Sequence, residues 1–278
     1  MRLSPTFKTI VLFGALTALL GVIGYLISGR GGLIIFLFLG ILSNVFAYLF
    51  GDKIALAMNG ARPLSKLEAP EIYQLTEDLT QRMSIPMPKL YISDNMQPNA
   101  FATGRGPGNS SVCITRGLAQ MLNKEEIQGV IAHELAHVKN RDVLIATIAA
   151  VIAGAVSSIA QLGIFFGGND RDRNPLVDLL VLILAPISAT LIQLAISRAR
   201  EFEADATAAQ YTKNPNGLAN ALIKIDKSVR QIPLEHGNRA MSSLYISNPF
   251  KGQGISELFS THPATEKRVQ RLMDMRLG

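Results

Sequence analysis

Charge and cysteine are scarce in this 278-residue chain, and tryptophan is absent. Only 17% of its residues are charged, whereas a soluble globular domain usually carries about a quarter. The net charge of +6 is modest. Without a dense basic run interleaved with aromatic residues, it predicts no nucleic-acid partner. Because 48% of the residues are apolar, the charge deficit predicts segments that lie in a membrane.

The single cysteine, Cys113, excludes an internal disulfide. It stands in a strand-like run, residues 111–115, where a cysteine usually behaves as a small core hydrophobe. We therefore expect a buried structural thiol rather than a reactive or metal-binding one. A chain without disulfides is compatible with a reducing compartment.

Histidine is also rare, yet two of the four histidines stand four residues apart, in the segment His133-Glu134-Leu135-Ala136-His137. On a helix, residues i and i+4 share a face, so both imidazoles can bind one tetrahedral Zn²⁺. Glu134 lies off that face, where a carboxylate can reach a water beside the metal and act as a general base. The segment therefore predicts a zinc site with one ion per chain.

The residues around this segment favour a helix. Asn123 can cap it, and Glu126 three residues later completes a capping-box pattern. Apolar residues then recur at helical spacing, at Ile127, Val130, Ile131, Leu135 and Val138. The alternative interpretation is a helix that carries two surface histidines and an ordinary carboxylate.

Four apolar runs are long enough to cross about 30 Å of hydrocarbon as helices. They cover residues 10–27, 31–50, 143–166 and 176–197. The first two predict a transmembrane hairpin over residues 1–51, with a tight turn at 28–32. The last two predict a second hairpin over residues 143–197, for which a buried hairpin of a soluble domain is the alternative.

Basic residues gather on one side of these runs. The segments outside the hairpins contain Arg2, Lys8, Lys53, Arg62, Lys66, Arg198 and Arg200. The two hairpin turns hold Arg30, and two arginines that are offset by two aspartates. The positive-inside rule then predicts that both termini lie in the cytoplasm, together with a catalytic domain formed by residues 52–142 and 198–278.

The first part of this domain carries signals for a small sheet. An amphipathic helix is predicted at Pro70–Met83, and strands are predicted at 89–93, 99–103 and 111–115. We expect the strands to form a small antiparallel sheet just before the metal helix. Its edge, Asn99-Ala100-Phe101-Ala102, can hold an extended peptide by main-chain hydrogen bonds. A purely structural hairpin is the alternative.

A second group of charged residues follows the fourth apolar run. If the helix continues there, Glu201 and Asp205 share one of its faces. A zinc ion with two histidines needs a third protein ligand, and Glu201 is the candidate. Asp205 can hydrogen-bond the free ring nitrogen of a ligating histidine and fix its tautomer. Glu203, the competing carboxylate, points away from that face.

The C-terminal part is predicted to be a helical tail. One helix covers residues 216–230, and a last amphipathic helix begins at His262-Pro263 and ends at Arg276. His262 and Arg268 can face the site as donors to the transition state. An exposed histidine and an exposed arginine are the alternative.

Three features together resemble the HtpX family of membrane-bound zinc metalloproteases, to which the CAAX prenyl proteases are related. They are the His133–His137 motif, the segment Glu201-Phe202-Glu203-Ala204-Asp205 after an apolar run, and the pair His262-Pro263. The resemblance covers essentially the whole chain. It implies that His133, His137 and Glu201 bind Zn²⁺, that Glu134 is the general base, and that Asp205 supports a ligating histidine.

The resemblance also implies the surroundings of the reaction. Residues Asn99–Ala102 are implied to align the substrate, and His262 and Arg268 to lie near the scissile carbonyl. The implied substrates are misfolded or damaged membrane proteins, handled in a stress-linked quality-control role.

The sequence thus predicts a mainly α integral membrane protein with about four transmembrane helices and a cytoplasmic zincin-like α+β catalytic domain. Its predicted function is that of a zinc endopeptidase of the cytoplasmic (inner) membrane, with the active site on the cytoplasmic face. The expected partners are the lipid bilayer and membrane-protein or unfolded polypeptide substrates.

Three other functions compete with this prediction. An intramembrane protease of the site-2 type is disfavoured because charged residues flank the histidine motif on both sides. A prenyl- or lipid-handling zinc enzyme is the second alternative. The third is a zinc-binding membrane scaffold without peptidase activity, against which the intact Glu134 argues.

Overall fold

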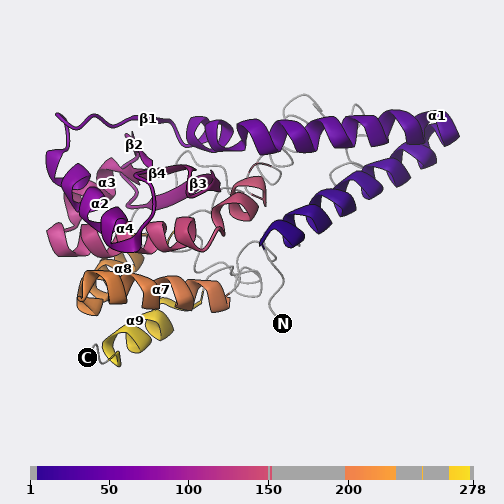
Figure 1. Ribbon diagram of the computed structural model, residues 1–278. Helices are drawn as coiled ribbons and strands as arrows, with labels where there is room; N and C mark the ends of the chain where they lie inside the picture. Colours follow the sequence, from indigo (N-terminus) through magenta and orange to yellow (C-terminus); the bar gives the residue numbers. More distant parts are fainter. Residues whose placement is uncertain (1–4, 150, 152–197, 230–245, 247–262, 276–278) are drawn as a thin grey trace, which may run out of the picture.

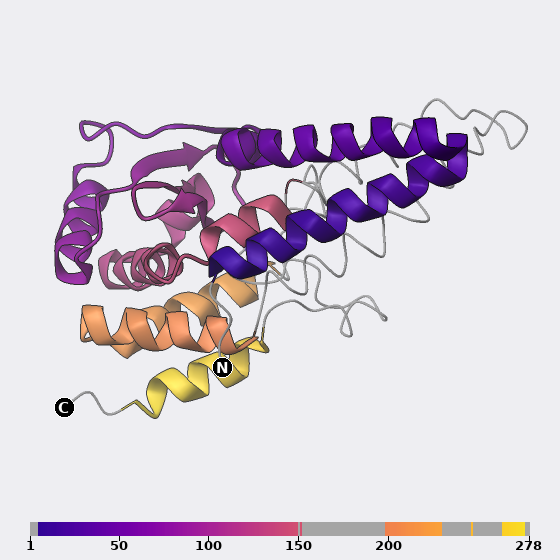
Figure 2. The same cartoon turned by 45° about the vertical axis from the view of Figure 1, so that its right-hand side comes forward.

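The computed structural model describes residues 5–149, 151, 198–229, 246 and 263–275 of the chain. A long helical hairpin, α1 (Pro5–Met58), projects from a body that contains a small sheet and the other helices. Figures 1 and 2 show its two arms leaving this body and meeting at the end farthest from the sheet. Most of the predicted second hairpin, residues 143–197, lies outside the described residues; its first part, 143–149, is helical.

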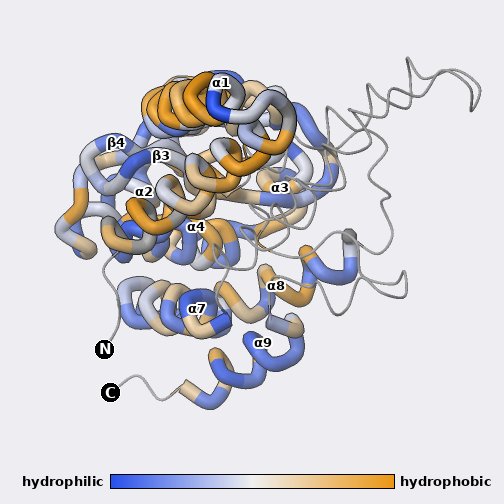
Figure 3. The backbone as a smooth tube through the Cα atoms, turned by 90° about the vertical axis from the view of Figure 1, so that its right-hand side faces the viewer, coloured by the Kyte–Doolittle hydropathy of each residue, from blue (hydrophilic) through white to orange (hydrophobic). Residues whose placement is uncertain are grey.

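The predicted turn between the two arms is present, because the backbone leaves the helix at Ser28 and Gly29. Gly29 has φ +59°, in the left-handed region that glycine adopts without penalty. Among the described residues, Ser28–Met58 is the one helix with the length and apolar composition to cross a membrane. The first arm contains a shorter apolar helix, Phe13–Leu26. Figure 3 shows strongly hydrophobic stretches along the hairpin.

Polar and small residues join the two arms. The Asn44 amide donates to the Phe13 carbonyl at 3.0 Å and to Thr17 Oγ1 at 2.8 Å. Near the turn, a Cβ atom at Gly32 would lie only 2.0 Å from the carbonyl oxygen of Gly24. Close approach through glycines and interhelical hydrogen bonds are the contacts that hold helices together in lipid, where hydrophobic burial adds little.

The sheet contains four strands in the order β1-β2-β4-β3. They are β1 (Ala61–Pro63), β2 (Lys89–Ser93), β3 (Ala100–Gly106) and β4 (Asn109–Thr115). β1 pairs with β2 and β3 pairs with β4 in antiparallel fashion, whereas β2 and β4 are parallel. One side of β3 therefore remains an edge of the sheet.

The prediction of an antiparallel sheet was wrong in one respect, since the sheet is mixed. The β3–β4 hairpin forms as expected, but β4 also pairs with β2, and this second pairing is parallel. The sequence analysis also missed β1. That strand is only three residues long and ends in Pro63, which lacks an N–H group and is tolerated at a sheet edge.

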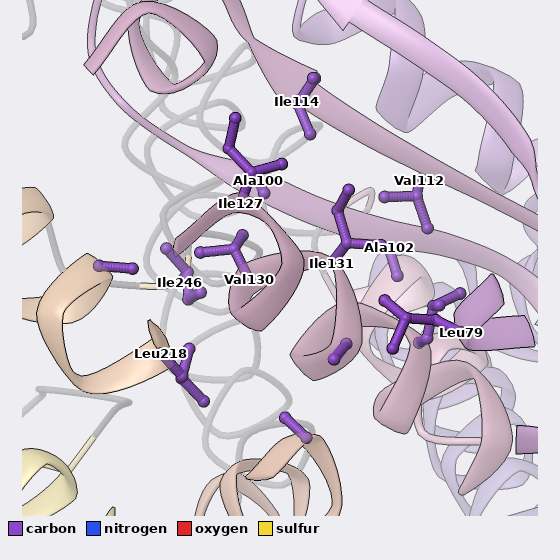
Figure 4. Packing of buried hydrophobic residues seen from close by; sticks show 14 of the residues in the cluster. Leu79, Ala100, Ala102, Val112, Ile114, Ile127, Val130, Ile131, Leu218 and Ile246 are labelled. Carbon is purple, nitrogen blue, oxygen red and sulfur yellow. The ribbon is translucent and has the colours of Figure 1, made fainter. Parts of the chain in front are cut away.

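The two faces of the sheet have different neighbours. Ala100 and Ala102 of β3 belong to the main core cluster, together with Val130 and Ile131 from the metal helix. Figure 4 shows this packing. Phe101 joins a second cluster, which contains Ala55, Leu56 and Cys113. The sheet is thus packed between the metal helix on one face and the base of the hairpin on the other.

Cys113 is fully buried in this second cluster, as the sequence predicts. Burial raises the pKa of its thiol to about 12. A thiol with this pKa carries almost no thiolate at neutral pH, and the thiolate is the reactive form. Cys113 therefore acts as a packing residue.

The metal helix, α4 (Lys124–Lys139), is buried along most of its length and packs against α2 (Pro70–Met83), α7 (Arg198–Thr212) and α8 (Pro215–Val229). Two further helices lie outside this layer: α3 (Arg116–Met121) packs on β4, and α9 (Thr265–Met273) packs on α8 and α7. The predicted α2 is confirmed with the same bounds, while α9 is shorter at both ends than predicted. Figure 1 shows α4 between the sheet and the pair α7 and α8.

We expect Gly129→Ala to destabilise the protein, because α4 and α8 touch at this glycine. An added Cβ would lie 2.7 Å from the backbone nitrogen of Leu218, which cannot move without shifting α8. Overpacking of this kind costs about 1–3 kcal/mol, more than the gain of about 1 kcal/mol from alanine's higher helix propensity. Thermal unfolding followed by circular dichroism measures the difference.

Gly108→Ala is the matched control, since a Cβ there meets nothing within 4 Å. Equal melting temperatures for the two variants would contradict a rigid contact between α4 and α8.

Candidate metal centre

His133 and His137 lie one turn apart on α4, as the motif requires. The helix begins at Asn123, whose side chain accepts from the backbone N–H of Glu126, while the Glu126 carboxylate accepts from the N–H of Asn123. This predicted capping box is confirmed and fixes the start of the helix. The two Nε2 atoms of the histidines are 3.2 Å apart.

Glu201 of α7 supplies the third group. Its Oε1 lies 3.5 Å from His137 Nε2, and its Oε2 lies 3.7 Å from His133 Nε2. Two ligands that hold one tetrahedral zinc at the usual bond lengths are roughly 3.3 Å apart. The ligand atoms of His133, His137 and Glu201 all lie within 4.8 Å of one another, so this donor set fits a single zinc-type ion.

A buried carboxylate orients the first histidine. Asp205 lies one turn after Glu201 on α7, is 2% exposed, and places Oδ1 at 3.0 Å from His133 Nδ1. Glu203 of the same helix is exposed. The second histidine has a more distant carboxylate partner: Asp142 Oδ2 lies 3.7 Å from His137 Nδ1.

The charges of the site follow from burial and from these partners. Burial lowers the pKa of His133 to about 4, so the ring is neutral at pH 7. Burial opposes ionisation of Asp205, but Arg268 overcomes it and lowers the pKa of this carboxyl to about 2. An ionised carboxylate can only accept a hydrogen bond. Nδ1 of His133 therefore carries the proton, and Nε2 keeps its lone pair for a metal.

The pKa values of His137 and Glu134 are raised, in contrast to those of His133 and Asp205. Burial opposes protonation of His137, but the nearby carboxylates of Asp142 and Glu201 raise its pKa to about 9. Burial raises the pKa of Glu134 to about 8, and His137 and the backbone of Ala102 oppose this shift. A bound cation would favour the neutral imidazole and the ionised carboxylate, because it repels a positive charge and attracts a negative one.

Glu134 lies near both the metal-binding groups and the sheet edge. It is 5% exposed, and its carboxyl is influenced by the charges of His137 and Glu201 and by the backbone N–H of Ala102 in β3. The carboxylate is therefore held next to the strand along which an extended peptide can align.

The register of β3 decides which of its groups face outward. The backbone N–H of Thr115 donates to the carbonyl of Asn99 at 2.9 Å, and the N–H of Asn99 donates to Thr115 Oγ1 at 2.9 Å. In an antiparallel pair the hydrogen-bonded positions alternate, so Phe101 also faces β4. The outward positions are Ala100, Ala102 and Gly104.

Two of the four predicted edge residues thus have other contacts. Asn99 precedes the strand, and its side chain accepts from the N–H of Ile246 at 3.2 Å. Phe101 packs under the sheet. At the far end, Thr147 Oγ1 accepts from the N–H of Gly104 at 3.3 Å and closes the outward edge there. Sequence analysis missed Thr147, because nothing in its local pattern links it to a strand 43 residues earlier.

Arg268 lies in the site but not as an exposed side chain. It is 2% exposed, and its guanidinium forms a two-bond pair with Asp205. Its Nη1 donates to the carbonyl of Ile246 at 2.8 Å. The predicted partner of Arg268 in the reaction, His262, lies outside the described residues.

Asp142 was also missed by the sequence analysis. It follows the end of α4, holds His137, and is paired with Arg200 Nη1 at 3.2 Å. The available signal was an acidic residue five positions after the second histidine, which resembles an ordinary helix end.

Comparisons with known proteins agree with this geometry. The sequence profile described as Peptidase family M48 matches residues 66–276. A protease HtpX homolog of Pyrococcus abyssi is 50% identical over 283 residues, which cover 100% of this chain and 98% of that protein. Another, from Burkholderia mallei, is 48% identical and covers 96% of each chain.

A solved structure has a similar fold. The crystal structure of Ste24p from S. mikatae superposes with a TM-score of 0.51 at 20% identity, over 94% of this chain. The match spans 63% of the Ste24p chain. The family profile covers most of the present sequence, and its relatives match from end to end. This chain therefore belongs to peptidase family M48, and it is a metallopeptidase.

Proposed function

We propose that the protein is a zinc endopeptidase of the cytoplasmic membrane that degrades misfolded or damaged membrane proteins under stress, with one Zn²⁺ per chain. The observation that carries this proposal is the position of Glu134. Its carboxyl is influenced by the charges of His137 and Glu201 and by the backbone N–H of Ala102 at the edge of β3, so it lies close to both the metal-binding group and this strand. A base, a metal-binding group and a peptide-binding edge therefore meet at one place.

His133, His137 and Glu201 are the proposed ligands, with Asp205 fixing the His133 ring. When bound there, zinc supplies a Lewis acid that acidifies water and polarises a peptide carbonyl. Glu134 accepts the proton of the attacking water and delivers it to the leaving amine. His262 is proposed to donate to the developing oxyanion.

The substrate is proposed to lie along β3 in an extended conformation. Ala100 and Ala102 direct their backbone groups outward, and these groups bind the main chain of any unfolded peptide. Binding through the main chain depends little on side chains. It therefore suits damaged polypeptides of varied sequence.

The membrane position also supports this substrate class. Residues 1–51 and 143–197 are proposed to form two transmembrane hairpins, with residues 52–142 and 198–278 in the cytoplasm. Phe101, next to the proposed binding positions, packs against Ala55 and Leu56 at the base of α1. The peptide-binding edge then lies close to the bilayer surface, where it meets segments that emerge from the membrane.

The test uses the purified full chain in lipid nanodiscs. Zinc content is measured by atomic emission, and cleavage is measured with one membrane protein in its folded and its thermally damaged forms. We expect one zinc per chain and faster cleavage of the damaged form, with both lost after chelator treatment and restored by zinc. Equal cleavage of the two forms would contradict the quality-control role, and cleavage of prenylated peptides alone would favour the lipid-handling alternative.

A further inference from the structure

The hydrogen bonds of the Arg268 guanidinium go to residues that support the metal site rather than into the space where a substrate would lie. Its Nε donates to Asp205 Oδ2 at 2.8 Å and its Nη2 donates to Asp205 Oδ1 at 2.6 Å. Such a pair fixes the plane of the carboxylate as well as its distance, because both oxygens are held.

The same carboxylate oxygen contacts the first metal-binding histidine. Asp205 Oδ1 lies 3.0 Å from His133 Nδ1, and Arg268 Nη2 lies 3.4 Å from both ring nitrogens of His133. Arg268, Asp205 and His133 are each 2% exposed or less. In this buried cluster, the arginine holds the carboxylate that contacts the imidazole.

A third contact connects this cluster to the sheet. Arg268 Nη1 donates to the carbonyl of Ile246 at 2.8 Å, and the N–H of Ile246 donates to Asn99 Oδ1 at 3.2 Å. Ile246 is 2% exposed and belongs to the main core cluster. Figure 4 shows it close to Val130 of α4. Asn99 immediately precedes β3. A single guanidinium therefore bridges the metal-binding residues and the start of the peptide-binding edge.

We infer that Arg268 is a positioning residue, which holds Asp205, and through it His133, in the orientation that binds the metal. This inference rests on the proposed zinc peptidase function and revises the role of Arg268 as a donor to the transition state. A donor must have an N–H group aimed at the reacting carbonyl. Nε, Nη1 and Nη2 of Arg268 each donate to a protein group, and Nη1 and Nη2 also lie 3.7 Å from Glu201 Oε2 and 3.4 Å from the ring nitrogens of His133, respectively.

The test compares zinc affinity in Arg268→Lys, Asp205→Asn and the double variant, each measured by competition with a chromogenic chelator. Lysine keeps the charge but cannot form the two-bond pair. Loss of such an outer partner lowers metal affinity by about 10–100-fold. We expect this loss in each single variant and no further loss in the double variant, because both substitutions break the same connection.

Arg271→Lys is the matched control on the same helix, since Arg271 is exposed and lies over the Phe202 ring. Circular dichroism identifies variants that do not fold, and Arg268→Gln, which also lacks the two-bond pair, replaces Arg268→Lys if that variant is one of them. Cleavage at saturating zinc gives a second readout, in which a positioning role predicts substantial recovery of kcat.

Unchanged zinc affinity in Arg268→Lys together with a lower kcat would overturn the inference in favour of a transition-state donor. If wild-type protein binds zinc but cleaves no peptide, the proposed function fails while the affinity series still decides the role of Arg268. A wild-type protein without zinc affinity overturns both proposals.

Discussion

Replacing Glu134 with glutamine will lower kcat by about 10³-fold and leave zinc bound, in line with the usual contribution of a general base. Glutamine has nearly the same shape, and its amide oxygen can occupy the place of a carboxylate oxygen near the backbone N–H of Ala102. It cannot take up the proton of the attacking water at neutral pH. Zinc content and the cleavage rate of an unfolded protein, measured on the same preparation, separate binding from chemistry.

Glu125→Gln is the control for this substitution. Glu125 lies on the same helix, but its side chain is exposed and accepts from the Asn214 amide. We expect its activity and its zinc content to equal those of the wild type. If Glu134→Gln loses zinc, Glu134 is a ligand or a structural group, and if it keeps more than a tenth of the activity, another group is the base.

The parts of the site that the sequence predicted well are those set by neighbours along the chain. The capping box of Asn123 and Glu126 and the spacing of His133 and His137 act within one helix, so local periodicity is sufficient to place them. The bounds of α2 follow in the same way from its apolar face and its first proline.

The parts that the sequence could not predict depend on contacts between distant segments. Which residues of β3 face outward is set by the register with β4, and a shift of one residue would exchange them. The sequence therefore marked Asn99–Ala102 as a group, although only Ala100 and Ala102 carry outward backbone groups. The parallel pairing of β2 with β4 also depends on contacts between distant segments, so the local sequence pattern does not predict it.

Arg268 illustrates what the residue type alone leaves open. An arginine near a catalytic metal is compatible with an exposed donor and with a buried clamp, and these two roles have the same residue type and spacing. Its partner Asp205 is 63 residues away in the chain. The choice between the roles follows from burial and from the direction of each N–H group, which only the folded chain defines.

Glu201→Gln will abolish stable zinc binding, and with it cleavage. Glutamine offers a neutral oxygen where the carboxylate offered a charged one, and Glu201 lies within 3.5 and 3.7 Å of the two histidine nitrogens. The loss of a direct ligand is expected to exceed the roughly 100-fold upper range for outer partners. Chelator competition measures the zinc affinity, and added zinc will restore activity only at concentrations far above those for the wild type.

Glu203→Gln is the decisive control, because the sequence left Glu203 as the competing carboxylate and the fold exposes it two residues along the same helix. Both substitutions remove one negative charge from α7, so a general electrostatic effect on zinc affinity would be similar in the two variants. A difference of several orders of magnitude isolates direct ligation by Glu201. Equal zinc affinities would show that the third ligand comes from elsewhere, and would remove the geometric basis for the metal centre described above.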